Sequence, residues 1–274
     1  SRRLIDACDS HKFDITREKV RRARQGYFAN ISYIDDKVGD LLETLRTTRM
    51  LDNTIVLFTS DHGDMLGERG LWFKMSFFEG SARVPLMVAG PGVTPRLVNE
   101  PVSTLDINPT LADLAGIDIG EILPWTDGES LVPLMNGGKR TTPVLMEYTA
   151  EGSQAPLVCI REGDWKFSHC ELDPPMLFNL KDDPQELTNL AADPANAALV
   201  AEWMERVRAH WDMARFDADI RQSQARRWVV YEALRNGAYF PWDYQPLQKA
   251  SERYMRNHMD LNILEESKRF PRGE

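Results

Sequence analysis

The sequence of 274 residues contains few cysteines, and the three that are present, Cys8, Cys159 and Cys170, do not show the Cys-x-x-Cys spacing of a structural metal site. An odd, small number of cysteines argues against a disulfide framework and favours a reducing compartment, so we expect a cytoplasmic protein.

Long apolar runs are also lacking. The runs at 54–59 and 84–89 have the length of strands, whereas a membrane span needs about 20 residues. No membrane partner is therefore expected. A signal peptide is not expected either, because no apolar region follows the opening Ser-Arg-Arg.

An excess of positive charge is the next missing feature. The 33 Lys and Arg residues are outnumbered by 42 Asp and Glu residues, which gives a net charge of −9. Binding to a nucleic-acid backbone needs clustered Lys and Arg, so we expect no nucleic-acid partner. A small anionic substrate remains compatible with this charge, because one metal ion and a few local cations can reverse the potential inside a cleft.

The first half of the chain has the pattern of an α/β fold. A helix is predicted after Thr16, and its apolar residues form one stripe that we expect to pack against a sheet. The apolar, non-alternating run at 53–60 predicts a strand buried on both faces, as in a parallel sheet. A second strand is predicted at 84–89 and a short helix at 106–116. The stripe consists of Val20, Tyr27, Ile31, Ile34, Val38, Leu41 and Leu45.

Near residues 133–143 the sequence changes from the α/β pattern to a different arrangement of predicted elements. Four short strand-like segments follow, separated by turns that contain Gly, Asp or Pro, and then a helix at about 194–213. This pattern predicts a small α+β subdomain with an antiparallel sheet. The predicted division is an α/β part at 1–135, the small subdomain at 136–216 and a C-terminal tail at 217–274. The four segments are 144–148, 157–161, 165–168 and 176–179.

A polar segment directly after the strand at 53–60 carries the candidate chemistry. Asp61 and His62 stand where that strand ends, and ligands of open α/β sheets bind outside the carboxyl ends of strands. Gly63 permits a sharp turn that lets both side chains reach one ion. Lys74 follows the glycine-containing loop and adds a positive charge. An isolated Asp-His-Gly is usually only a turn, but the buried strand and the loop favour a metal site.

The same segment resembles the sulfatase branch of the alkaline phosphatase superfamily. The similar blocks, which lie within residues 17–210, are Thr-Ser-Asp-His-Gly-Asp-Met-Leu-Gly at 59–67, Lys74, Phe-Glu-Gly-Ser-Ala-Arg-Val-Pro at 78–85, 105–110 and 177–186. The resemblance implies that residues 1–135 are the C-terminal part of an alkaline-phosphatase-like α/β sandwich. It also implies that Asp61 and His62 bind the metal and that Lys74 donates to a sulfate oxygen or to the leaving group. The alternative for Lys74 is a solvated loop cation.

The sequence of the tail restricts the resemblance to one group of sulfatases. The blocks at 227–234, 240–243 and 250–257 resemble the C-terminal extension of bacterial choline sulfatases, which hydrolyse choline O-sulfate to choline and sulfate. This resemblance implies that the tail forms a homo-oligomer, either a dimer or a tetramer. A choline head group needs a carboxylate, and Glu151, in the loop after the strand at 144–148, is the candidate substrate-binding residue. The alternative for Glu151 is an ordinary surface glutamate.

One departure from the family concerns the nucleophile. Sulfatases use a formylglycine made from Cys or Ser in a Cys/Ser-x-Pro-x-Arg motif, and no Cys or Ser of this chain has that context. The resemblance therefore implies that the formylglycine and a further metal-binding carboxylate belong to a missing N-terminal half. Ca²⁺ is the metal expected from the resemblance, with Mn²⁺ or Mg²⁺ as alternatives. The nitrogen ligand of His62 moves the balance from Ca²⁺ toward Mn²⁺ or Zn²⁺. Two other functions remain open, a phosphonate or phosphate mono- or diester hydrolase and an inactive interaction module.

Overall fold

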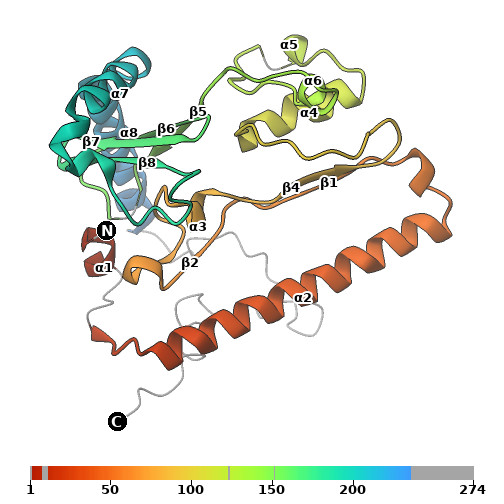
Figure 1. Cartoon of the computed structure of the whole chain (residues 1–274), viewed down its shortest axis with the longest axis horizontal. Helices are drawn as coiled ribbons and strands as arrows, with labels where there is room; N and C mark the ends of the chain where they lie inside the picture. Colours follow the sequence, from red (N-terminus) through yellow and green to blue (C-terminus); the bar gives the residue numbers. More distant parts are fainter. Residues whose placement is uncertain (1, 8–11, 123, 151, 236–274) are drawn as a thin grey trace. The chain divides into compact units, whose positions relative to one another are not determined.

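The computed structural model describes residues 2–7, 12–122, 124–150 and 152–235 (Figure 1). The chain divides between Asp217 and Ala218 into two compact units. The three-part division with boundaries at 135/136 and 216/217 stays a prediction. None of the helices in the described ranges combines the length and the apolar character that a membrane span requires.

Two helices open the first unit, α1 (Arg2–Ala7) and the long α2 (Arg17–Thr47). Thr16 caps α2 as predicted, because its hydroxyl accepts a hydrogen bond from the Lys19 backbone N–H at 3.3 Å. The predicted packing of the apolar stripe is only partly realised. The stripe faces a sheet across an open groove, but no residue of α2 is buried, and Ile31 and Ile34 each remain 49% exposed. The helix is thus held by its ends and by its own hydrogen bonds more than by a core.

The predicted strands at 53–60 and 84–89 are present as β1 (Val56–Thr59) and β4 (Leu86–Ala89). The predicted parallel, fully buried environment of β1 is wrong in this structure. β1 pairs with β4 in a two-stranded antiparallel sheet (Figure 1), and all four of its residues are only half-buried. An apolar run indicates that a strand has an apolar environment, but it does not indicate the direction of the neighbouring strand.

Short elements connect these strands to each other and to the rest of the unit. Helix α4 (Ile107–Leu114) confirms the helix predicted at 106–116. It starts at the fully buried Asp106, whose carboxylate accepts the Ser103 backbone N–H at 2.7 Å and pairs with Arg140 at 2.7 Å. The remaining short elements are η2 (Leu51–Asn53), β2 (Met65–Leu66), η3 (Glu68–Gly70), β3 (Trp72–Phe73), α3 (Glu79–Ala82), η4 (Thr104–Asp106), α5 (Ile119–Ile122) and α6 (Val132–Met135).

An antiparallel sheet of four strands follows, as the sequence predicts. Its strands are β5 (Val144–Tyr148), β6 (Leu157–Glu162), β7 (Trp165–Cys170) and β8 (Asp173–Asn179), in the order β5-β6-β7-β8. After η5 (Leu190–Ala192) and η6 (Pro194–Asn196), helix α7 (Ala197–His210) covers one face of the sheet. The core between them is closed, since its sheet residues are 0% exposed and Trp203 of α7 is 3% exposed. Those sheet residues are Val158, Ile160, Phe167 and Leu177.

The opposite face of this sheet contacts the segment that carries the candidate chemistry. Side chains alternate between the two faces of a strand, so Lys166 and Ser168 of β7 lie on the face away from Phe167. On this side Phe178 of β8 packs with Met65, Leu71 and Phe78 in a second apolar cluster. The sheet therefore has one face for its own core and one face for the loops between β1 and β4.

The last described element is helix α8 (Met213–Arg235), which continues from the first unit into the second. Trp228 and Tyr231 on this helix have ring centroids 5.2 Å apart and are exposed. The tail blocks at 240–243 and 250–257 lie outside the described residues.

Candidate metal and catalytic site

Asp61 and His62 follow the last residues of β1, where the chain turns away from the two-stranded sheet. Their side chains lie together, with 3.4 Å between Asp61 Oδ2 and His62 Nε2. Oxygen and nitrogen ligands stand about 2.0–2.6 Å from a divalent metal, so two donors at this separation can bind the same ion. The Asp61 side chain is 82% exposed, which leaves its free oxygen accessible.

Hydrogen bonds orient both side chains for metal binding. Nδ1 of His62 lies 2.9 Å from the Gly63 carbonyl oxygen, and donation from Nδ1–H to this acceptor leaves the lone pair on Nε2, the atom nearest Asp61. Asp61 Oδ1 accepts the His62 backbone N–H at 2.9 Å and the Ser60 hydroxyl at 3.3 Å. The backbone hydrogen bond from His62, helped by the Ser60 hydroxyl, lowers the pKa of Asp61, so the carboxylate stays ionised.

Gly63 holds this turn against α3. Its N–H donates to the Ser81 carbonyl oxygen at 2.8 Å. A Cβ atom at position 63 would lie 2.3 Å from the Gly80 carbonyl oxygen, a contact too short for any other residue. The glycine therefore permits the turn after β1 to approach the backbone of α3 closely. This contact holds the segment that carries Asp61 and His62 against α3.

Lys74 belongs to the segment just before α3, and its side chain is exposed. Its backbone is fixed by Ser81, whose buried hydroxyl lies 2.6 Å from the Lys74 carbonyl oxygen and 2.8 Å from that of Ser76. The preceding residue, Phe73, has a positive φ of 66°, which is unfavourable for a bulky side chain. The ring of Phe73 is 60% exposed. One residue, Ser81, thus holds the backbone next to both Lys74 and Gly63.

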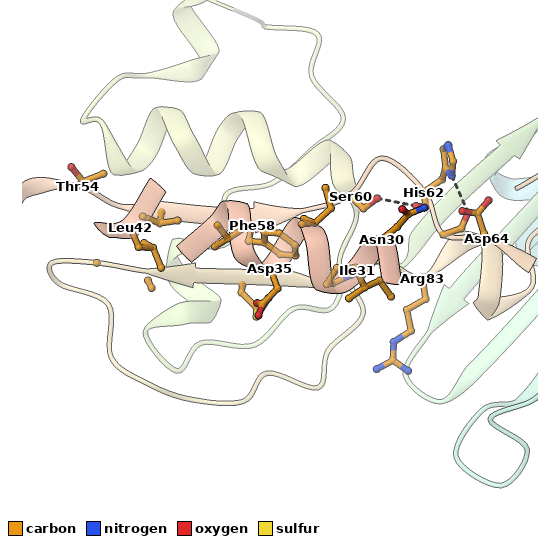
Figure 2. Close-up of a pocket in the computed structure, with 18 of the residues that line it drawn as sticks. Asn30, Ile31, Asp35, Leu42, Thr54, Phe58, Ser60, His62, Asp64 and Arg83 are labelled. Atoms are coloured by element: carbon orange, nitrogen blue, oxygen red, sulfur yellow. Dashed lines mark hydrogen bonds between the residues drawn. The ribbon is translucent and has the colours of Figure 1, made fainter. Parts of the chain in front are cut away.

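A groove runs from this turn between α2 and the β1–β4 sheet. Figure 2 shows its lining, from Leu42 and Thr54 at one end to His62 and Asp64 at the other. Its volume of about 1230 Å³ exceeds the roughly 300–1,000 Å³ of a small-molecule pocket. Away from the turn the lining is mostly apolar, with Ile34, Val38, Leu42, Val56 and Phe58.

Several polar residues at the His62 end were not identified from the sequence. Asn30 of α2, Asp64 and Arg83 line the groove there (Figure 2). Arg83 Nη1 lies 4.0 Å from Glu79 Oε2, and the Arg83 side chain is 79% exposed, so it is also available to an anion. Burial and the nearby Asp64 raise the pKa of Tyr27. The position of Arg83 inside a matched block was the available signal, whereas nothing in the sequence places α2 opposite β1.

The described residues provide two donors for a metal and no more. Within the described ranges, no group of three or more His, Cys, Asp or Glu side chains is arranged to hold an ion. The paired donors of Asp61 and His62 fit one side of a divalent metal site, whose other ligands would have to come from elsewhere. The predicted substrate-binding residue Glu151 lies outside the described residues.

Comparison with protein families assigns most of the chain. The sulfatase family model matches residues 6–117, and the model of the C-terminal region of N-sulphoglucosamine sulphohydrolase matches residues 67–212, more than half of the chain. The model named choline sulfatase enzyme C terminal matches residues 218–270. Together the three matches cover residues 6–212 and 218–270.

Individual proteins agree with these models. The choline-sulfatase of Rhizobium meliloti (strain 1021) is 67% identical over 277 aligned residues, which cover 100% of this chain and 54% of that protein. Arylsulfatase K of Gallus gallus is 38% identical over 65% of this chain and 35% of its own length. The chain thus spans about half or less of the length of the relatives that it matches.

Solved structures show the same fold. The phosphonate monoester hydrolase of Agrobacterium radiobacter superposes with a TM-score of 0.63 and 30% identity, over 72% of this chain and 42% of that one. A putative sulfatase from Bacteroides thetaiotaomicron gives a TM-score of 0.64 and 29% identity, over 76% and 46%. The predicted α/β class of the alkaline-phosphatase-like type is thereby confirmed. The chain belongs to the sulfatase family and corresponds to the C-terminal portion of a choline sulfatase.

Proposed function

We propose that this chain supplies the metal-binding and lysine-bearing part of a sulfuric ester hydrolase whose substrate is choline O-sulfate. The observation that carries the proposal is the Asp61–His62 pair, two donors 3.4 Å apart at the end of β1 in a chain of the sulfatase family. The choice of substrate is supported by 67% identity to a choline-sulfatase and by the choline sulfatase model that matches the tail. The products would be choline and sulfate.

Asp61 Oδ2 and His62 Nε2 are the proposed metal ligands. Ca²⁺ is our first assignment, with Mn²⁺ or Mg²⁺ as alternatives, because an imidazole ligand is less typical of calcium. When bound, the ion would stabilise negative charge on the sulfate oxygens. The formylglycine nucleophile and the remaining ligands would come from protein outside this chain, since no residue here has the formylglycine motif.

Lys74 is the proposed catalytic residue. Its exposed ammonium would donate to a sulfate oxygen or to the leaving oxygen of choline, where negative charge develops. Fixing the Lys74 backbone through Ser81 limits the positions that the ammonium can reach, so less order has to be imposed when substrate binds. For the choline end, Glu151 is the proposed counter-charge. The homo-oligomer formed through the tail and the cytoplasmic location are further parts of the proposal.

The test joins this chain to the N-terminal part of the Rhizobium meliloti choline-sulfatase, in a host that makes formylglycine. This fused enzyme should hydrolyse choline O-sulfate faster than an aryl phosphonate monoester. Lys74→Ala should lower kcat by about 10²–10³-fold, the usual effect of removing one donor to a developing anion. Lys181→Ala removes another exposed lysine, in the turn after β8, and should leave kcat unchanged.

A second function is favoured by one finding, the similarity to the phosphonate monoester hydrolase of Agrobacterium radiobacter. A higher rate on the aryl phosphonate would replace choline O-sulfate hydrolysis by phosphonate or phosphate ester hydrolysis. Absence of any hydrolysis in a folded fused enzyme with formylglycine present would leave the inactive interaction module as the better description.

A further inference from the structure

A buried ion cluster lies behind the candidate site, on the face of the four-stranded sheet that contacts the loops. The Lys166 side chain of β7 is 3% exposed, and its Nζ is 2.8 Å from Oε1 of both Glu79 and Glu186. The geometry at Glu79 is that of a hydrogen bond, whereas Glu186 Oε1 is an ion-pair contact without hydrogen-bond geometry. Buried lysines are rare unless they are paired, so the position of this ammonium is set by its two carboxylate partners.

The cluster is connected to the first residue of α3 by backbone as well as by charge. Glu186 Oε2 accepts the Glu79 backbone N–H at 2.7 Å, so one carboxylate contacts both Lys166 and the start of α3. Glu186 itself has a φ of 55°, a conformation that a non-glycine residue keeps only where its surroundings hold it. The two carboxylates exceed the single ammonium by one charge, and Arg83 at 4.0 Å from Glu79 lies at the exposed edge.

Ser81 of α3 connects the ion cluster to the candidate site. Ser81 is buried and touches both halves of the candidate site, because its hydroxyl donates to the Lys74 carbonyl oxygen and its own carbonyl oxygen accepts the Gly63 N–H. The distances along this path are all between 2.6 and 2.8 Å. The path therefore runs from the subdomain sheet through α3 to Lys74 and to the turn that carries Asp61 and His62.

We propose that Lys166 and Glu186 are positioning residues that clamp α3, and that through Ser81 they set the positions of Lys74 and of the Asp61–His62 pair. They touch neither metal nor substrate. The inference rests on the proposed function for its catalytic consequence, but its structural part can be judged on this chain alone.

The decisive variant is the double substitution Lys166→Met/Glu186→Leu. The two apolar side chains fill the space of the ion pair, but they leave the Glu79 N–H without its acceptor and the Glu79 carboxylate without its ammonium. We expect the variant to fold with a lowered melting temperature. Hydrogen exchange in a peptide covering residues 61–66 should be at least tenfold faster. In the fused enzyme kcat should fall at least tenfold, with KM changed less than threefold.

Three controls separate positioning from stability. Glu186→Gln keeps an oxygen that can accept the Glu79 N–H and should retain exchange rates within threefold of the parent. Arg140→Met breaks the other buried pair, with Asp106, and should lower the melting temperature without changing exchange at 61–66. Ser81→Ala leaves the ion cluster and the Ser81 carbonyl oxygen intact but removes the hydroxyl that contacts the Lys74 and Ser76 carbonyl oxygens. It should therefore speed exchange in a peptide covering residues 74–78 and lower kcat, which keeps the proposal testable if the double variant does not fold.

The proposal is overturned if the double variant keeps the parent's exchange rates at 61–66, or, where the double variant does not fold, if Ser81→Ala keeps the parent's exchange rates at 74–78. It is also overturned if exchange rises while kcat is unchanged, since α3 would then not position the catalytic groups. Inactivity of the parent fused enzyme would instead count against the proposed sulfatase function, and the exchange data would still decide whether the clamp exists.

Discussion

The two sides of the first unit differ in how they are stabilised. The subdomain of β5–β8 and α7 encloses a core in which Phe167 is 0% exposed and Trp203 is 3% exposed. The region of α2, β1 and β4 contains the candidate metal ligands, but its helix has no buried residue, β1 is only half-buried, and every second residue of β4 is exposed. The candidate site thus lies in the region with the weaker core, next to the well-packed region that supports it.

This difference explains why the sheet of the subdomain is apolar on one face and mixed on the other. The face toward α7 needs only shape and apolar area, whereas the opposite face must hold loops whose backbone has many polar groups. The buried Glu186 and Ser81 side chains satisfy such backbone groups at α3, and Lys166 pairs with the Glu186 carboxylate. Polar residues are thereby concentrated where the supporting region meets the chemical one.

The largest expected effect is on the supporting core. Trp203→Ala removes a side chain that stacks on Phe167 with ring centroids 6.0 Å apart, and it should lower the free energy of unfolding by about 3–5 kcal/mol. Phe58→Ala in the half-buried β1 should cost about 1 kcal/mol, since only part of the ring leaves water on folding. Urea denaturation followed by far-UV circular dichroism measures both. Equal losses would show that β1 belongs to a core of its own, and the contrast between the two regions would fail.

The next effect concerns metal affinity. Asp61→Asn removes the ionised oxygen that faces His62 Nε2 and should weaken Mn²⁺ binding at least tenfold, measured by calorimetry on the fused enzyme. Asp52→Asn is the matched control, because Asp52 is an exposed acid at the other end of the same groove. The free energy of unfolding without metal should change by less than about 0.5 kcal/mol in both variants. Undiminished affinity in Asp61→Asn would remove Asp61 from the site.

The sequence was sufficient to predict elements whose pattern is local. The cap at Thr16, the four antiparallel strands and the helix after Asp106 follow from periodicity and turn residues, and the structure confirms them. The position of Asp61 and His62 at a strand end was predicted for the same reason, since an apolar run followed by a polar pair is a local pattern.

Features that depend on distant partners were not predictable. The antiparallel pairing of β1 with β4 depends on the path of residues 60–85, and no residue of β1 encodes it. The burial of Lys166 is a second example, because an alternating strand shows only that Lys166 faces away from Phe167. Its carboxylate partners come from positions 79 and 186, more than one element away, and only the folded chain brings them together.

The smallest expected effect tests how completely the supporting region excludes water. Cys159 of β6 is 0% exposed, and burial raises the pKa of its thiol to about 12. A free thiol titrates near about 8.5, so the contribution of the protonated form to stability is complete below that pH and is lost as the pH rises toward 12. At pH 8.5, iodoacetamide should therefore leave Cys159 unmodified in the folded chain and alkylate it in denaturant, as read by peptide mass. Trp203→Ala should speed the reaction in the folded chain, because it destabilises the core on the other face of the same sheet and makes opening of the sheet more frequent. Alkylation of the parent chain at the denatured rate would mean that the sheet opens as readily as the half-buried region, and the two regions would not differ in the way proposed.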